Sequence, residues 1–194
     1  MLAALYTPAL QPATRLSLFG GVALPLAQGG GDSPRPARSA AVGSGIYGRA
    51  AMDNALFAVD YAVGIAGAGV AHSIGVCSFQ VETTVLQLVR VRAEQRQKDT
   101  SRTNLTAAAF AGCYLRSPLQ LMSEFRYQRW LSTPAAVSAD AAKREQASVG
   151  LGLRFDARVG SVLLRPGVLV ALPIDDPMRK GDYRQLMLDL PVVF

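Results

Sequence analysis

The chain has 194 residues, half of them hydrophobic, with a mean hydropathy of +0.21 and a formal net charge of +6. This length suits one domain with a full core and leaves little room for two. We therefore expect a single domain over residues 1–194, either whole or as the C-terminal part of a longer chain. The arginines are spread singly and are not grouped with aromatic residues, which argues against nucleic-acid binding.

No helical membrane span is expected. The most apolar stretch, residues 55–76, is interrupted by Asp60 and His72, whereas a membrane-spanning helix needs about 20 apolar residues in a row. The first eight residues have no basic region and too short an apolar run for a secretory signal. We interpret them as an expression start or a fragment boundary.

Along the chain, apolar and polar residues alternate with the period of two that is typical of β-strands. Leu151 and Leu153, for example, fall on one face of a predicted strand, and Arg154 falls on the other. The alternation predicts about eight strands, over residues 15–26, 55–65, 79–92, 106–116, 119–128, 149–158, 162–172 and 185–194.

The connections between these strands alternate between long and short, as they do in membrane β-barrels with short periplasmic turns and long extracellular loops. With the carboxyl terminus on the periplasmic side, every long connection falls outside and the amino terminus inside. The long connections cover residues 27–53, 93–104, 133–146 and 175–183, and the short ones cover 67–73, 117–118 and 159–160.

Charged residues of both signs fall on the strand face opposite the almost purely apolar one. A lipid-facing apolar row places these charges in the lumen, where they would fill a narrow barrel and prevent conduction. A soluble barrel would have the opposite polarity. The predicted lumen charge network consists of Asp60, Glu82, Glu124, Asp156 and Asp189 together with Arg90, Arg92, Arg116, Arg126, Arg154, Arg158 and Arg165.

The last strand carries the most specific signal. Its sequence, Tyr183-Arg-Gln-Leu-Met-Leu-Asp-Leu-Pro-Val-Val-Phe194, resembles the carboxy-terminal recognition strand of bacterial outer-membrane β-barrel proteins. The resemblance implies insertion by the barrel assembly machinery and contact with outer-membrane lipid and lipopolysaccharide. Pro191 departs from the usual pattern because it removes one ladder donor. The expected assembly signal consists of Leu186, Leu188, Leu190, Val192 and Phe194.

Cys77 and Cys113 fall on neighbouring predicted strands, on the same face and in the periplasmic half. A cross-strand disulfide, which an oxidising compartment permits, is one interpretation. Two small apolar residues on the lipid-facing side is the other. Metal binding is not expected, because two thiols lack further ligands.

Catalysis and cofactors are not predicted. Some small outer-membrane barrels that resemble this chain are lipid hydrolases or acyltransferases that use Ser and His. Here the single histidine, His72, lies next to Ser73 in a predicted turn, where we expect a solvated residue. No phosphate cradle or nucleophile elbow is present.

Aromatic and basic residues suggest membrane contacts near the outer ends of the strands. Phe125, Tyr127 and Trp130 are expected to form an interfacial aromatic belt. Basic residues of the outer loops would contact lipid phosphates or simply be solvated; they are Arg96, Lys98, Arg102, Arg179 and Lys180.

Together these patterns predict an all-β chain forming an antiparallel transmembrane β-barrel of about eight strands in the outer membrane of a Gram-negative cell envelope. The expected role is structural, anchoring or surface-interacting, with the loops contacting a protein partner in the envelope. Three alternatives remain: a porin-like pore built as part of a larger barrel or oligomer, a lipid-modifying enzyme, and a soluble β-barrel carrier.

Overall fold

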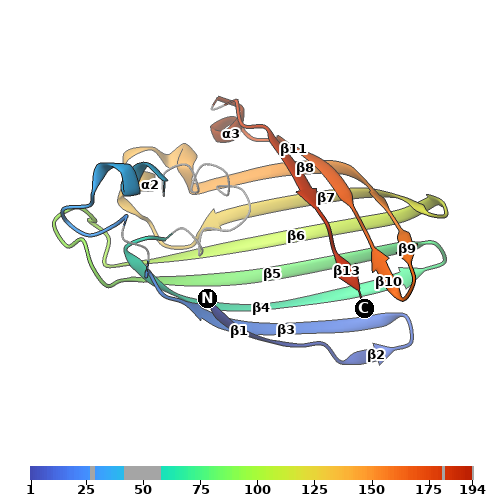
Figure 1. Cartoon of the computed structure of the whole chain (residues 1–194). Coiled ribbons are helices and arrows are strands. Elements are labelled where there is room, and N and C mark those ends of the chain that lie inside the picture. Colours follow the sequence, from blue (N-terminus) through green and yellow to red (C-terminus); the bar gives the residue numbers. More distant parts are fainter. Residues whose placement is uncertain (27–28, 42–57, 181, 194) are drawn as a thin grey trace.

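The computed structural model describes residues 1–26, 29–41, 58–180 and 182–193. The chain forms antiparallel β-sheet that curls round, so that the strands near the carboxyl terminus lie in front of the long central strands (Figure 1). The prediction of an all-β antiparallel chain is confirmed. The predicted number of strands, about eight, is wrong, because the described residues form thirteen strand segments.

Ten segments belong to the main sheet and three to a short second sheet. The strands are β1 (Leu2–Tyr6), β2 (Ala9–Gln11), β3 (Thr14–Ala23), β4 (Tyr61–Ile74), β5 (Cys77–Arg90), β6 (Ser101–Arg116), β7 (Leu119–Trp130), β8 (Glu145–Phe155), β9 (Ala157–Val159), β10 (Val162–Leu164), β11 (Gly167–Pro173), β12 (Gln185–Asp189) and β13 (Val192–Val193). The helices include α2 (Ala135–Ala139), the 3-10 helix η2 (Ala141–Arg144) and α3 (Asp176–Lys180).

Proline accounts for much of the difference in strand count. Pro8 separates β1 from β2, Pro166 precedes β11, and Pro191 separates β12 from β13. Proline has no N–H to donate to the ladder, so it interrupts a strand that would otherwise continue. The predicted strands over residues 162–172 and 185–194 are therefore each divided into two shorter ones.

The strands of the main sheet follow the order β1-β3-β4-β5-β6-β7-β8-β11-β12, and each is antiparallel to the next. The second sheet has the order β13-β10-β9. Among the described residues, β1 and β12 pair on one side only. The sheet therefore has two open edges, and the closed barrel is not seen.

Long and short connections lie at opposite ends of the sheet. The short turns are residues 12–13, 75–76, 117–118 and 160–161, at what we call the short-turn end. The connections at the long-connection end are those between β3 and β4, β5 and β6, β7 and β8, and β11 and β12. Because β1 and β2 run antiparallel to β3, the chain begins near the long-connection end; the expected position at the other end is wrong.

The predicted turn over residues 67–73 is also wrong, because this stretch lies inside β4 and the turn comes at Gly75, whose φ is +56°. The glycines of β4 instead admit close neighbours. A Cβ added to Gly67 would lie 2.2 Å from the ring of Phe19, and one added to Gly69 would lie 2.9 Å from the Val81 carbonyl oxygen. Glycine within a strand often marks such an approach, which resembles a turn signal in sequence.

The register gives the curled sheet one apolar and one polar face. We call the outer face of the curl convex and the inner face concave. On the convex face, Val70 pairs with Val81, and Phe125 pairs with Val149. Many large apolar side chains of this face are exposed to solvent. They include Val70 at 45%, Val81 at 59%, Phe125 at 44%, Leu151 at 61%, Val170 at 44% and Leu188 at 76%. Exposed apolar rows on adjacent strands form a continuous apolar surface.

The concave face is more varied than predicted. In the middle of this face, Glu82 on β5 lies opposite Ala108 on β6, and Ala108 lies opposite Arg126 on β7. Charged side chains are thus found on the inner face, where they were predicted. Toward the long-connection end, however, a small hydrophobic core packs inside the curl, with Trp130 against it. The buried residues of this core are Ala23, Tyr61, Val63, Leu86 and Leu88.

Gly21 tests whether the edge strand β1 is an integral part of the sheet. A Cβ at this position would lie 2.5 Å from the Leu2 carbonyl oxygen, a backbone atom that cannot move without shifting β1. Gly21→Ala should therefore lower the free energy of unfolding by about 1–3 kcal/mol and speed hydrogen exchange in β1. The control is Gly64→Ala, whose Cβ would meet its nearest atom at 3.9 Å. Equal effects of the two substitutions would contradict this.

Candidate functional site: the charged concave face

The middle of the concave face carries a charged cluster on β5 and β7. Arg126 Nη2 lies 2.7 Å from Glu124 Oε1, two residues away on the same strand face. Gln80 Nε2 donates to Glu82 Oε2 at 3.4 Å. A cavity of about 330 Å³ reaches from these side chains to Arg154 on β8. Polar atoms from several strands thus share one space inside the curl.

A second cluster lies at the short-turn end. Arg165 Nε lies 2.9 Å from Asp156 Oδ1, and Tyr114 Oη donates to Asp156 Oδ2 at 2.6 Å. Nearby, Arg154 forms an ion pair with Asp189. The Arg165 and Asp156 side chains are only 28% and 21% exposed, so water screens this pair less than a surface pair. These contacts tie β6, β8 and the C-terminal strands together.

A third cluster lies at the long-connection end, around the side chain of Asp60, a residue that is 2% exposed. It lies 3.3 Å from Arg92 Nε and accepts a hydrogen bond from Gln97 Nε2 at 3.0 Å. It also accepts from the Gly31 backbone N–H at 2.8 Å. A buried carboxylate needs such partners because desolvation alone would disfavour it.

Most of the predicted charge network is therefore brought into contact, but as three separate clusters. Eight of the predicted residues form four pairs of opposite sign: Asp60 with Arg92, Glu124 with Arg126, Arg154 with Asp189, and Asp156 with Arg165. Arg90 donates to the Gln97 carbonyl oxygen instead. Within the part of the chain that the structure describes, the exposed Arg116 and Arg158 form no ion pair.

Sequence reasoning missed the uncharged members of these clusters. Tyr114 and Gln97 each bond a carboxylate, yet neither was singled out. Tyr114 shares its strand face with Phe110 and Gly112, and this parity alone would have placed it inside. Gln97 lies in a connection, where periodicity gives no information.

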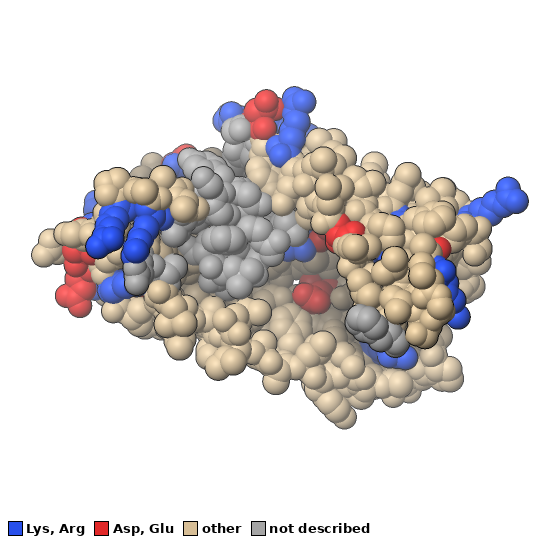
Figure 2. Space-filling view, viewed as in Figure 1, with Lys and Arg blue, Asp and Glu red and all other residues tan. Residues whose placement is uncertain are grey.

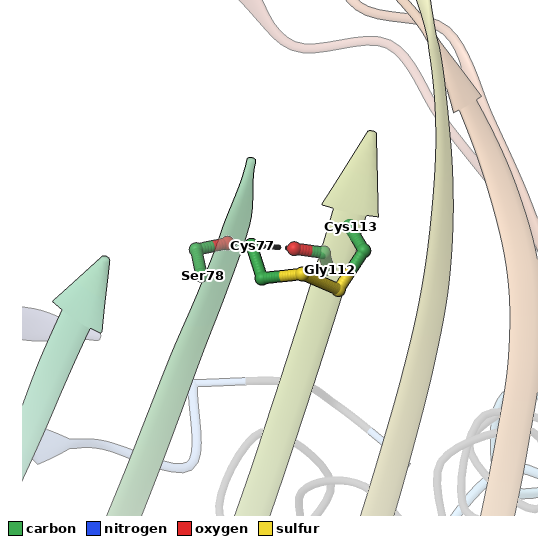
Figure 3. The surroundings of a disulfide bond; sticks show 4 residues. All are labelled: Cys77, Ser78, Gly112 and Cys113. Atoms are coloured by element: carbon green, nitrogen blue, oxygen red, sulfur yellow. Dashed lines mark hydrogen bonds between the residues drawn. A yellow bond between two sulfur atoms is a disulfide. The ribbon is translucent and has the colours of Figure 1, made fainter. Parts of the chain in front are cut away.

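Cys77 and Cys113 form a disulfide with an S–S distance of 2.19 Å (Figure 3). The two residues lie directly opposite each other on β5 and β6. They share the convex face with Phe79 and Leu121, near the short-turn end. The bridge therefore links two neighbouring strands on the apolar side of the sheet.

His72 lies inside β4 and not in a turn, which corrects its predicted position. Its Nδ1 is 2.7 Å from Thr14 Oγ1 on the paired strand. Thr14 is the only hydrogen-bond partner of the His72 ring that the described structure shows, so no carboxylate orients the ring there. Among the described residues, no three His, Cys, Asp or Glu side chains gather as a metal site.

The expected aromatic belt is divided between two faces. Phe125 and Tyr127 point to the convex side, but Trp130 packs against the hydrophobic core, because its position in β7 has the opposite parity. Arg102 also differs from its predicted role as a loop residue. It is the second residue of β6, pairs with Asp99 at 2.9 Å, and its Cζ lies 4.6 Å from the centroid of the Tyr61 ring. Arg96 donates to the Gly31 carbonyl oxygen at 3.0 Å, and Lys180 lies 3.5 Å from Asp176.

The predicted assembly-signal residues form an exposed apolar row on β12 and β13. Leu186, Leu188, Leu190 and Val192 are between 41% and 76% exposed. Phe194 lies outside the described residues. The break at Pro191 is bridged by its carbonyl oxygen, which accepts from the Arg165 backbone N–H at 2.9 Å.

Comparison with known protein families, curated proteins and solved structures found no match to this chain. No helix in its described part is long and apolar enough to cross a membrane. The functional argument therefore depends on the geometry of the two sheet faces and the clusters above.

The disulfide should contribute substantially to stability. It closes a loop between residues 36 positions apart, which restricts the unfolded chain. The double variant Cys77→Ala, Cys113→Ala should lose about 2–4 kcal/mol of unfolding free energy, measured by urea titration in detergent. Reduction of the unmodified protein serves as the control and should give the same shift. An unchanged midpoint in both would contradict the role of the bridge.

The cluster at the short-turn end should also stabilise the fold. Arg165→Ala leaves the partly buried Asp156 carboxylate without its ion-pair partner, so we expect a loss of about 1–3 kcal/mol. The matched control is Arg184→Ala, whose side chain is 73% exposed and pairs with an exposed Asp182; it should change stability by less than about 0.5 kcal/mol. Thermal melts of both variants would be compared, and equal shifts would count against the cluster.

Proposed function

We propose that this protein is an integral β-barrel protein of a bacterial outer membrane, with a structural, anchoring or surface-interaction role. The observation that carries the proposal is the exposed apolar convex face of the sheet, set against a concave face with charged clusters. Water-soluble proteins bury such apolar rows. A lipid bilayer is the surrounding that suits them.

The extent of the apolar surface strengthens this argument. Leucine, valine and phenylalanine side chains are exposed on the convex side of strands from β3 to β12. Soluble monomers rarely expose a continuous apolar patch larger than a few hundred Å². Each Å² removed from water contributes roughly 25 cal/mol, so many half-exposed side chains together favour membrane insertion strongly.

The membrane form proposed here is a closed barrel, because in hydrocarbon every backbone N–H and C=O needs a protein partner. Its short turns would face the periplasm and its long connections the cell exterior, as in known membrane barrels. The exposed row on β12 and β13 supports recognition by the barrel assembly machinery. The disulfide is consistent with an oxidising compartment such as the periplasm and the cell surface.

The charged clusters support a non-conducting barrel. Ion pairs at the short-turn end, in the middle and at the long-connection end place charged side chains on the inner side at three levels. Interaction is then assigned to the long connections, which carry α2 and α3. We expect their partners to be lipopolysaccharide, outer-membrane lipid or another envelope protein.

The same observations weigh against the alternatives. A soluble carrier needs an apolar interior, but the large exposed apolar side chains lie on the convex face. A lipid-modifying enzyme built on His72 needs a nucleophile and an acid beside it, and in the described structure His72 bonds only Thr14. A pore needs an open path, whereas charged side chains project into the interior at three levels.

The first test is refolding in detergent followed by unboiled and boiled SDS gels and circular dichroism. We expect a β spectrum and a mobility difference between the two gels, because folded membrane β-sheet proteins resist SDS until they are boiled. Retention of the protein in solution without detergent, as a monodisperse species, would contradict the membrane assignment.

A pair of arginine substitutions tests which surface faces lipid. Leu151→Arg, in the middle of β8 where the side chain is 61% exposed, should cost about 2–4 kcal/mol of stability in bilayers. Leu131→Arg, just past the end of β7 and 49% exposed, should cost no more than about 1 kcal/mol because it lies near the interface. In a water-soluble protein both would be nearly neutral. Urea unfolding from phospholipid vesicles distinguishes the two cases.

A further inference from the structure

We propose that the seam between β1 and β12 takes up one further β-strand, supplied by an extended segment of another polypeptide and antiparallel to both edges. This inference rests on the proposed membrane barrel. It concerns how that barrel is completed and what kind of partner it binds.

Strand direction is the first argument. Leu2, at the start of β1, pairs with Val22 near the long-connection end, and β1 and β2 run from there toward the short-turn end. β12 follows α3 at the long-connection end and continues into β13 toward the short-turn end. The two edge strands therefore run in the same direction. One strand between them, running the opposite way, restores the antiparallel order found everywhere else in the sheet.

The exposure of both edges is the second argument. Leu2, Leu5 and Tyr6 on β1 are 75%, 67% and 65% exposed, and Leu188 on β12 is 76% exposed. In the described structure neither strand has a partner on its outer side. Lipid cannot supply hydrogen bonds to these edges, so the bilayer itself does not complete them.

β1 is built into the sheet and does not simply rest against it. Its backbone approaches Gly21 so closely that no Cβ would fit there. β1 therefore remains beside β3, and the vacant side of the seam is its other edge. This disfavours a barrel in which β3 turns away from β1 to pair with β12.

A hollow lies at the seam. In the space-filling view it separates the region of β1 and β3 from the C-terminal strands, and acidic atoms are visible within it (Figure 2). On its inner side, a cavity of about 280 Å³ is bordered by Ala3, Phe19 and Ile65 and reaches Glu82 and Arg126. An added strand would cover this cavity and shield the charged cluster from lipid.

A second copy of this chain fits less well. Copies related by rotation about the membrane normal keep their strand directions, so an edge of one copy would meet an edge of the other in parallel. Parallel pairing is slightly less stable per residue than antiparallel pairing. A separate strand of the opposite direction avoids this at both edges.

The neighbouring side chains define the partner's chemistry. On the lipid side the added strand would lie between Leu2, Ala4 and Tyr6 of β1 and Leu186 and Leu188 of β12, and thus needs apolar residues at alternate positions. On the inner side it would meet Ala3 and Leu5, and also Asp189, which is already paired with Arg154. The inner positions therefore favour small or uncharged residues.

A peptide with the sequence of residues 14–23 that carries Arg15→Ser, so that its inner positions are uncharged, is a suitable probe. In the protein this segment is β3, which alternates correctly and already pairs antiparallel with β1 on its other side. The peptide would carry an activated cysteine at the position of Val22, near its C-terminal end. The protein would be full length, refolded in vesicles, with its native disulfide intact and one added cysteine.

We expect cross-linking to Leu2→Cys and to Leu186→Cys, because an antiparallel peptide brings its C-terminal end to the long-connection end. Yields there should exceed several-fold those at two controls. Tyr6→Cys lies nearer the other end of β1 and tests direction. Leu121→Cys, 43% exposed on the interior strand β7, tests location. A peptide with proline at its fifth position should cross-link poorly everywhere.

Equal yields at all four positions would overturn the proposal. So would a disulfide that forms without peptide between Ala4→Cys and Leu186→Cys or Leu188→Cys, since it would show that β1 and β12 pair directly. Each variant would first be checked for insertion into the vesicles and for a β spectrum. Failure of the unsubstituted protein in that check would contradict the membrane barrel itself, which keeps the two proposals distinguishable.

Discussion

The strict alternation of side chains across the sheet is the constraint on which the rest of the structure depends. Paired residues share a face, so Val70, Val81, Ala109, Phe125 and Val149 form one apolar row across β4 to β8. A slip of one residue in any strand would bring its apolar side chains inside and its charges outside. The same pattern therefore fixes the register and separates the apolar face from the charged one. The fold and the proposed membrane environment therefore both follow from this alternation.

Missing side chains matter as much as those present. Gly167 on β11 lies between Arg154 on β8 and Asp189 on β12, and a Cβ there would come within 2.2 Å of an Asp189 oxygen. The ion pair between these two residues exists because glycine leaves the space between their strands open. Gly67 and Gly21 similarly admit the Phe19 ring and the β1 backbone. Glycines thus let neighbouring elements approach closely at several points of the sheet.

These features determine how much of the fold and of the candidate site could be predicted from the sequence. Alternation is a local signal, so the long strands β5, β7 and β8 and the faces of Glu124 and Arg126 could be predicted from it. The glycines of β4 led to a wrong prediction of a turn, because glycine occurs both in turns and where neighbouring strands approach closely. β1 was missed because Leu2, Ala3, Ala4 and Leu5 are apolar on both faces and show no period. The ion pair of Arg154 with Asp189 joins residues on strands that do not pair, which no local pattern indicates.

The position of the disulfide bears on how the sheet can be completed. Cys77 and Cys113 join β5 to β6, near the middle of the strand order and several strands from either edge. The central wall from β4 to β8 is thus the most firmly connected part, with long ladders and a covalent link. The edge strands are short and interrupted by Pro8 and Pro191. Adjustment that admits a further strand can therefore be confined to the strands beside the seam, while the pair of Glu124 with Arg126 on β7, inside the central wall, keeps its geometry.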